Sequence, residues 1–142
     1  MPICSWRAAM MTTAVESSVL LDLLTGSLDE AARAADSLKN CVNDGPVIVC
    51  ETVIAEIMPE LGVDQLTKFL RSWQLDFVLS NAICAIRAGQ MYAEYLRRGG
   101  RRGRVVPDFL IGAHAFTFSD RLLTRDNGFG RDYFRGLKTM SP

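Results

Sequence analysis

Short apolar segments alternate along this chain with longer segments in which apolar residues recur at helical spacing. The clearest short segment is Val47–Cys50, four consecutive apolar residues that predict a strand buried on both faces. Further strands are expected at 14–15, 75–79 and 121–124, and 137–140 is the candidate for a final edge strand. Because parallel neighbours need crossovers, the pattern predicts a three-layer α/β/α sandwich with a central, mostly parallel sheet of four or five strands.

Turn residues divide the intervening segments into helices. The first helix is expected to start on a serine cap at Ser17 or Ser18 and to end before Gly26. Pro107 and Asp108 open the last one, since proline fits the first turn and an acid there complements the helix dipole. The other predicted helices cover residues 28–41, 52–61, 63–73 and 82–96.

The length and composition predict one domain. A chain of 142 residues that is 49% hydrophobic has enough apolar side chains for a single core, which we assign to 11–142. Residues 1–10 are expected to form a poorly ordered extension, because Met10 and Met11 directly precede the first strand. The 16 basic and 16 acidic residues cancel, so any nucleic-acid binding must come from local patches.

The cysteines and the apolar runs exclude several classes of protein. Cys4, Cys41, Cys50 and Cys84 are scattered, form no C-x-x-C pair and accompany a single histidine, His114, which argues against a zinc site. No apolar run is long enough to span a membrane, and the first residues lack the pattern of a secretory signal. A cytoplasmic protein with free thiols is therefore expected.

Four acids are predicted to meet at one edge of the sheet. Glu16 ends the first strand, Glu56 lies one turn into the helix after the second, Asp108 starts a helix, and Asp126 follows the fourth strand. Sites in such sheets form beyond the carboxyl ends of the strands. Each acid alone has a plainer interpretation: a solvent-facing or arginine-paired glutamate, a helix N-terminal acid, or a turn residue.

A cluster of carboxylates indicates a divalent cation. Two unit charges 4 Å apart repel by about 4 kcal/mol at an effective dielectric constant near 20, and Mg²⁺ or Mn²⁺ relieves such repulsion. Glu16, Asp108 and Asp126 are the candidate metal ligands, and Glu56 completes the candidate catalytic set. A cation beside a phosphate stabilises the charge that develops during in-line displacement, so phosphodiester hydrolysis is the predicted reaction.

Four ordered segments resemble the signature blocks of PIN domains: 15–24, 52–57, 107–115 and 122–129. The resemblance implies a PIN-like fold over nearly the whole chain and metal-binding or water-positioning acids at Glu56, Asp108 and Asp126. It also implies that Ser18 and Thr124 are polar neighbours of the site. For the VapC-type branch it implies an RNA substrate, a homodimer and a small cognate antitoxin, and thus the toxin of a type II toxin–antitoxin system.

One residue departs from the family pattern, which usually has aspartate where this chain has Glu16. The extra methylene would move the carboxylate by roughly 1 Å, which can cost about 100-fold in rate. A PIN-like module that binds RNA or protein without cutting is therefore the second hypothesis. A flavodoxin-like regulatory domain is a third, but Lys39, Lys68 and Lys138 do not end strands near the acids.

Arginines are concentrated just before Asp108. Arg101, Arg102 and Arg104, which follow Arg97 and Arg98, are candidate phosphate-binding residues, or they belong to a solvated loop. Arg125, beside Asp126, either contacts phosphate or forms an ion pair. The histidine is not assigned to the site, because six residues separate it from Asp108 along the same helix.

Overall fold

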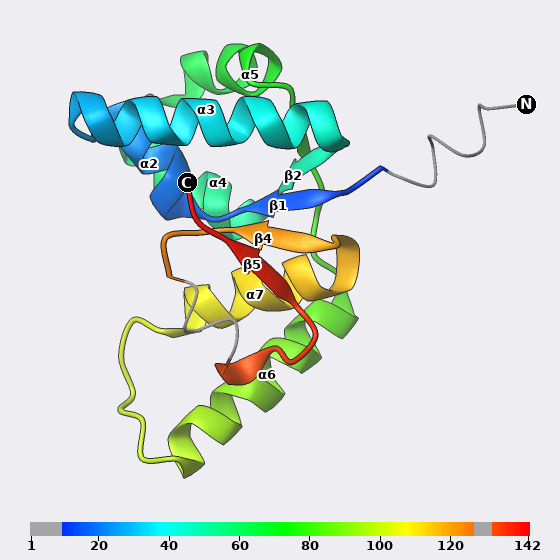
Figure 1. Cartoon of the computed structure of the whole chain (residues 1–142). Helices are drawn as coiled ribbons and strands as arrows, with labels where there is room; N and C mark the ends of the chain where they lie inside the picture. The colour runs from blue at the N-terminus through cyan, green and yellow to red at the C-terminus, as the bar shows by residue number, and fades with distance from the viewer. Residues whose placement is uncertain (1–9, 127–131) are drawn as a thin grey trace, which may run out of the picture.

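A computed structural model describes residues 10–126 and 132–142 (Figure 1). A five-stranded sheet runs through its centre in the order β3-β2-β1-β4-β5, and every neighbouring pair is parallel. The strands are β1 (Thr13–Val15), β2 (Val47–Val49), β3 (Leu75–Phe77), β4 (Arg121–Leu123) and β5 (Lys138–Met140). The predicted α/β sheet is confirmed, with the edge strand present and no antiparallel pair among the described strands.

Helices lie on both faces of the sheet (Figure 1), as a parallel sheet requires. In the described part of the chain they are α2 (Ser17–Thr25), α3 (Leu28–Asp44), α4 (Glu51–Leu61), α5 (Val63–Ser72), α6 (Ala82–Arg97) and α7 (Val106–Phe118). In Figure 1, α2, α3 and α5 lie on one side of the strands and α6 and α7 on the other. The predicted three-layer sandwich is therefore confirmed.

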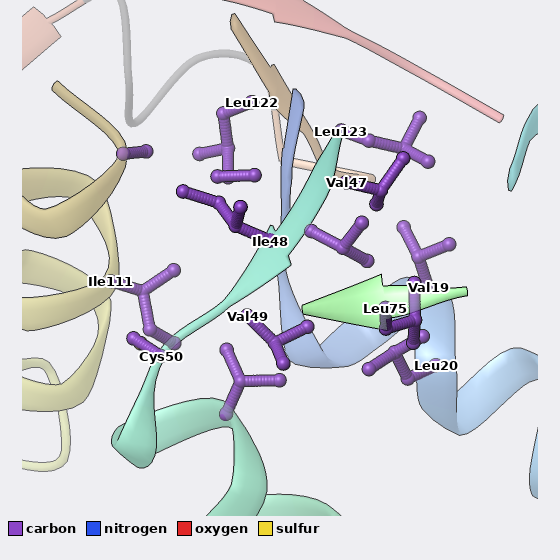
Figure 2. Packing of buried hydrophobic residues seen from close by; sticks show 14 of the residues in the cluster. Val19, Leu20, Val47, Ile48, Val49, Cys50, Leu75, Ile111, Leu122 and Leu123 are labelled. Atoms are coloured by element: carbon purple, nitrogen blue, oxygen red, sulfur yellow. The ribbon is translucent and has the colours of Figure 1, made fainter. Parts of the chain in front are cut away.

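The core follows from the alternation of side chains along the strands. Figure 2 shows Ile48 and Leu122 on the side of Ile111, which belongs to α7, and Val47 and Leu123 on the opposite side, towards α2. All five side chains are buried. Both faces of the sheet are thus apolar, which explains why the sequence of β2 is a continuous apolar run.

Several predicted element boundaries are wrong. The first helix is capped by Glu16 and not by a serine. The next helix, α3, runs three residues beyond the predicted end, to Asp44, where Gly45 with φ 156° ends it. Cys50 is the N-cap of α4 and lies outside β2, and β3 ends at Phe77, two residues early.

Other predictions fall partly outside the described residues. Residues 1–9 of the expected extension, with Cys4, and residues 127–129 of the fourth PIN-like block lie there. Within the described ranges Cys41, Cys50 and Cys84 are buried free thiols, as expected. None of the helices in these ranges has the length and apolar character needed to span a bilayer.

The strand order places a switch point beside β1. The chain leaves β1 towards β2 and β3 on one side, then returns to place β4 and β5 on the other. Crossovers on opposite faces leave a crevice beyond the carboxyl ends of the two central strands, where ligands bind in open α/β sheets. Glu16 directly follows β1 and Thr124 directly follows β4.

Candidate active site

Acidic side chains from three places in the sequence meet at this switch point. Glu16, Asp108 and Asp126 line one small cavity of about 30 Å³, which we call the acidic cavity. Asp108 comes from the first turn of α7, and Asp126 lies two residues beyond Thr124. The remaining wall consists of Ile111, Gly112, Leu122, Thr124 and Phe134. The structure thus brings together three of the four predicted acids, while their chemical roles stay predictions.

Glu16 is anchored at the start of α2. Its Oε2 accepts hydrogen bonds from the backbone N–H of Ser18 at 3.1 Å, from the Ser18 hydroxyl, and from the Thr124 hydroxyl at 3.2 Å. Oε1 accepts no hydrogen bond from the described residues, which leaves one oxygen of this carboxylate open to a cation. Ser18 and Thr124 thus both contact Glu16, while their part in a site stays a prediction.

Thr124 also positions Asp126. Its Oγ1, which donates to Glu16, accepts the backbone N–H of Asp126 at 3.0 Å. The backbone N–H of Arg125 in turn donates to the Ser18 hydroxyl at 3.4 Å. These bonds tie the chain that leaves β4 to the first turn of α2, and so fix Asp126 relative to Glu16.

Glu56 approaches the site from α4. Its Oε1 accepts a 2.5 Å hydrogen bond from the hydroxyl of Ser17, which is buried at the first position of α2. Glu56 does not line the acidic cavity, yet its charge acts on Asp108. The fourth predicted acid thus lies outside the cavity lining but close enough to act on Asp108, and sequence reasoning missed its contact with Ser17.

Asp108 is the group most affected by this arrangement. Partial burial, followed by repulsion from Glu16, Glu56 and Asp126, raises its pKa from 3.8 to about 6. Solvent still reaches the side chain, so the repulsion acts across a partly wet space. Glu16, Glu56 and Asp126 therefore lie close enough to Asp108 for their charges to act on it, and a cation bound there would offset this repulsion.

The donors in the cavity fit a hard divalent cation. The side-chain donors are the carboxylate oxygens of three acids and the Thr124 hydroxyl, and oxygen is the ligand atom that Mg²⁺ and Mn²⁺ prefer. Within residues 10–126 and 132–142, no group of three or more histidine, cysteine, aspartate or glutamate side chains has the spacing of a complete metal site. An Mg²⁺ ion held by one or two carboxylates, with waters and a substrate phosphate as its other ligands, needs no such group.

Arg125 forms ion pairs, which is one of the two alternatives left by its sequence position, while a contact with phosphate stays a prediction. Its guanidinium lies 3.3 Å from Oδ2 of Asp22 and 3.4 Å from Oε2 of Glu30. The Asp22 side chain is only 8% exposed, so this pairing compensates a nearly buried charge. The partnership escaped sequence reasoning, although an aspartate inside the apolar stretch 19–24 was a signal that a cation must lie nearby.

The predicted loop arginines do not line the acidic cavity. Arg101, Arg102 and Arg104 are exposed between α6 and α7.

His114 is buried, and its Nε2 lies 2.7 Å from the carbonyl oxygen of Val78. Burial lowers the pKa of His114, which favours the neutral ring. This histidine belongs to the packing between α7 and the end of β3, consistent with its omission from the candidate site.

Solved structures share this fold over most of their length. A chain of VapBC2 from Rickettsia felis, bound to a DNA fragment from its promoter, has a TM-score of 0.72 at 19% identity and covers 92% of this chain and 98% of its own. FitAcB from Neisseria gonorrhoeae has a TM-score of 0.68 at 16% identity, covering 90% and 96%. VapC20 from Mycobacterium tuberculosis, a sarcin–ricin loop cleaving toxin, has a TM-score of 0.54 at 15% identity, covering 89% and 98%.

These comparisons bear on the fold. No family profile and no curated protein sequence matches the chain. The structural neighbours are VapC-type PIN-domain proteins, so the fold implied by the four sequence blocks is confirmed. At identities below 20% the likeness concerns backbone architecture, and the activity has to be argued from the acids.

Proposed function

We propose that this chain is a metal-dependent endoribonuclease that hydrolyses RNA phosphodiester bonds, and that it is the toxin of a toxin–antitoxin pair. The observation that carries the proposal is the shared electrostatic environment of Glu16, Glu56, Asp108 and Asp126 at the switch point of the sheet. Burial and the charges of three neighbouring carboxylates raise the pKa of Asp108, and such a site favours a positively charged ligand. A divalent cation with a phosphodiester is the ligand that this chemistry suits.

Each acid has a part in this scheme. Bound Mg²⁺ or Mn²⁺ would supply charge stabilisation at the scissile phosphate and a more acidic water. Glu16, through its open Oε1, Asp108 and Asp126 are the candidate ligands, of which one or two would hold the ion while waters and the substrate phosphate complete its coordination. Glu56, which is held by the Ser17 hydroxyl outside the cavity lining, would orient water. Thr124 keeps Glu16 and Asp126 in register, so little reorganisation is needed when the ion binds.

The toxin assignment is supported by the neighbours. VapC20 is described as a toxin that cleaves the sarcin–ricin loop, which makes structured or single-stranded RNA the proposed substrate class here. Several other neighbours are VapBC and FitAB assemblies, some of them bound to DNA. By analogy with these assemblies, we propose a small antitoxin as the protein partner of this chain. The proposed toxin acts in the cytoplasm as a homodimer.

The test is RNA cleavage by the purified protein in EDTA, Mg²⁺ and Mn²⁺. Wild type should cut only with metal, and Asp108→Asn should reduce the rate by at least about 100-fold, because it removes a charge that the ion needs. Asp64→Asn is the matched control, since Asp64 also lies in the first turn of a helix, α5, but outside the acidic cavity. Cleavage that is absent with both metals, or equal in Asp108→Asn, contradicts the nuclease proposal.

A second candidate is a binding module with little or no activity. The hydrogen bonds to Oε2 of Glu16 favour it, because two donors of Ser18 at the start of α2 and the Thr124 hydroxyl after β4 already engage this oxygen. Glu16→Asp separates the two proposals. If glutamate weakens the site, the shorter side chain should raise metal-dependent cleavage. An unchanged rate in an active enzyme would show that glutamate is fully compatible with catalysis.

A further inference from the structure

A second and larger hollow adjoins the acidic cavity. It measures about 590 Å³ and lies between α6 and the segment 132–135, which Figure 1 shows beside α6. We call it the arginine groove, after the guanidinium groups in its lining. The lining residues that matter here are Arg87, Arg97, Arg98, Arg135, Phe116 and Tyr133.

Positive charge is concentrated in this groove although the chain as a whole is neutral. Four arginines line it against two acids, Glu94 and Asp132, so positive charges exceed negative ones by two. Glu94 pairs with both Arg97 and Arg98, which leaves part of each guanidinium for other acceptors. The side chain of Arg97 is 68% exposed. A surface of this kind attracts phosphates.

Aromatic rings alternate with the arginines. The guanidinium of Arg87 lies 5.0 Å from the centre of the Phe116 ring, and that of Arg98 lies 5.1 Å from the centre of the Tyr133 ring. The hydroxyl of Thr117 fixes Arg87 further, by accepting a 2.9 Å hydrogen bond. Unpaired bases stack on guanidinium groups and aromatic rings that are held in this way. Such stacking depends little on the base sequence of the nucleic acid.

The groove and the acidic cavity share a wall. Phe134 lines both, and its ring lies so close to Gly112 that a Cβ there would approach it to 2.4 Å. Phe134 also packs against Phe116, with the ring centres 6.3 Å apart. Phe134 therefore borders both hollows, and a nucleic-acid strand lying in the groove would run beside a wall of the acidic cavity.

We propose that the arginine groove binds single-stranded RNA next to the phosphate that is cut. The guanidiniums of Arg97 and Arg135 contact its phosphates, and the Arg87–Phe116 and Arg98–Tyr133 pairs stack against its bases. The inference rests on the proposed function for the identity of the strand, but it assigns binding to residues separate from the metal-binding acids. It also predicts unpaired RNA in preference to duplex, whose bases are not available for stacking.

Binding is tested without catalysis, by fluorescence anisotropy of a labelled single-stranded RNA 12-mer in EDTA. The double variant Arg97→Gln/Arg135→Gln should raise Kd at least 10-fold. It should also lower the slope of log Kd against log salt by roughly 1.4, because each phosphate that an arginine neutralises contributes about 0.7. Lys68→Gln/Arg71→Gln on α5 is the charge-matched control, and it should bind as wild type does.

A second variant tests stacking independently of charge. Arg98→Lys keeps the cation but removes the planar group over Tyr133, so it should weaken RNA binding several-fold with little change in the salt dependence. Circular dichroism of each variant checks that the fold is retained. Equal affinity of the groove and control double variants, or no binding by wild type, overturns the groove proposal.

The outcomes separate this inference from the proposed function. Wild type that binds RNA in EDTA but never cuts it with metal contradicts the nuclease proposal and leaves the groove intact. Wild type that cuts RNA while the groove variants bind normally contradicts the groove alone. Preference for a duplex 12-mer over the single strand contradicts the stacking geometry.

Discussion

Asp108→Asn should stabilise the metal-free protein at high pH and leave its stability at low pH nearly unchanged. Burial and three neighbouring carboxylates raise the pKa of Asp108 to about 6 in the folded state, from 3.8. The unfolded chain therefore releases this proton at a lower pH than the folded chain does. The free energy of unfolding falls as pH rises between these values, and above about pH 6 the full cost of the charge is present.

The size of this effect on stability follows from how far the pKa of Asp108 is raised. A pKa of about 6 in place of 3.8 means that ionising Asp108 lowers the free energy of unfolding by at most about 3 kcal/mol. Because solvent reaches Asp108, screening reduces this to about 1 kcal/mol. Asparagine removes the charge at similar size, so at pH 8 the variant should gain about 1 kcal/mol, or roughly 0.5 M in the urea midpoint for an m-value of about 2 kcal/mol/M.

Urea denaturation in EDTA at pH 3.8 and pH 8 measures this difference. Comparing wild type with Asp108→Asn at each pH cancels the titration of the other carboxylates. Asp64→Asn is again the control, and it should lower stability by a few tenths of a kcal/mol at pH 8 because it removes an acid from the positive end of α5. If Asp108→Asn is no more stable than wild type at pH 8, the four acids do not repel one another as the structure implies.

Three further predictions concern stability and metal. Ser17→Ala should lower stability by about 1–3 kcal/mol in urea denaturation, because it removes the hydrogen bond to the charged Glu56, whereas Ser17→Thr, which keeps the hydroxyl, should recover part of the loss. Gly112→Ala should cost about 1–3 kcal/mol by forcing the buried Phe134 ring to move, a loss that Phe134→Leu should reduce in the double variant. Addition of Mg²⁺ or Mn²⁺ should raise the Tm of wild type above its value in EDTA, and a Tm unchanged by both ions would contradict a metal site at the acids.

The main features of the fold were predictable from the sequence because parallel α/β sheets have a strong pattern. A run such as 47–50 is apolar throughout only when both faces are covered, and helical segments on either side supply the covers. The switch point follows from strand order, and residues at strand ends fall at one edge. Strand ends and helix starts were therefore enough to place Glu16, Asp108 and Asp126 together.

The contacts that orient these acids were not predictable. Ser17 and Ser18 are adjacent and chemically alike, yet Ser17 donates to Glu56 on α4 while Ser18 donates to Glu16. Which hydroxyl faces which acid depends on the rotation of α2 about its axis, which the sequence pattern does not define to within one residue. The arginine groove was also missed, because its aromatic partners come from α7 and from a segment more than thirty residues beyond α6.

The side chain of Glu16 makes both a local contact, with the start of α2, and a contact with a residue distant in sequence, Thr124. Asparagine, aspartate and serine are the usual N-cap residues, since their short side chains reach the free N–H groups without strain. Here the longer glutamate reaches the Ser18 N–H and, at the same oxygen, the Thr124 hydroxyl on the neighbouring strand end. The extra methylene thus lets one carboxylate cap α2 and join β1 to β4, while its second oxygen remains available for an ion. Substitution by aspartate would have to trade one of these contacts for another, so Glu16→Asp should change stability and cleavage in opposite directions if glutamate was retained for the fold.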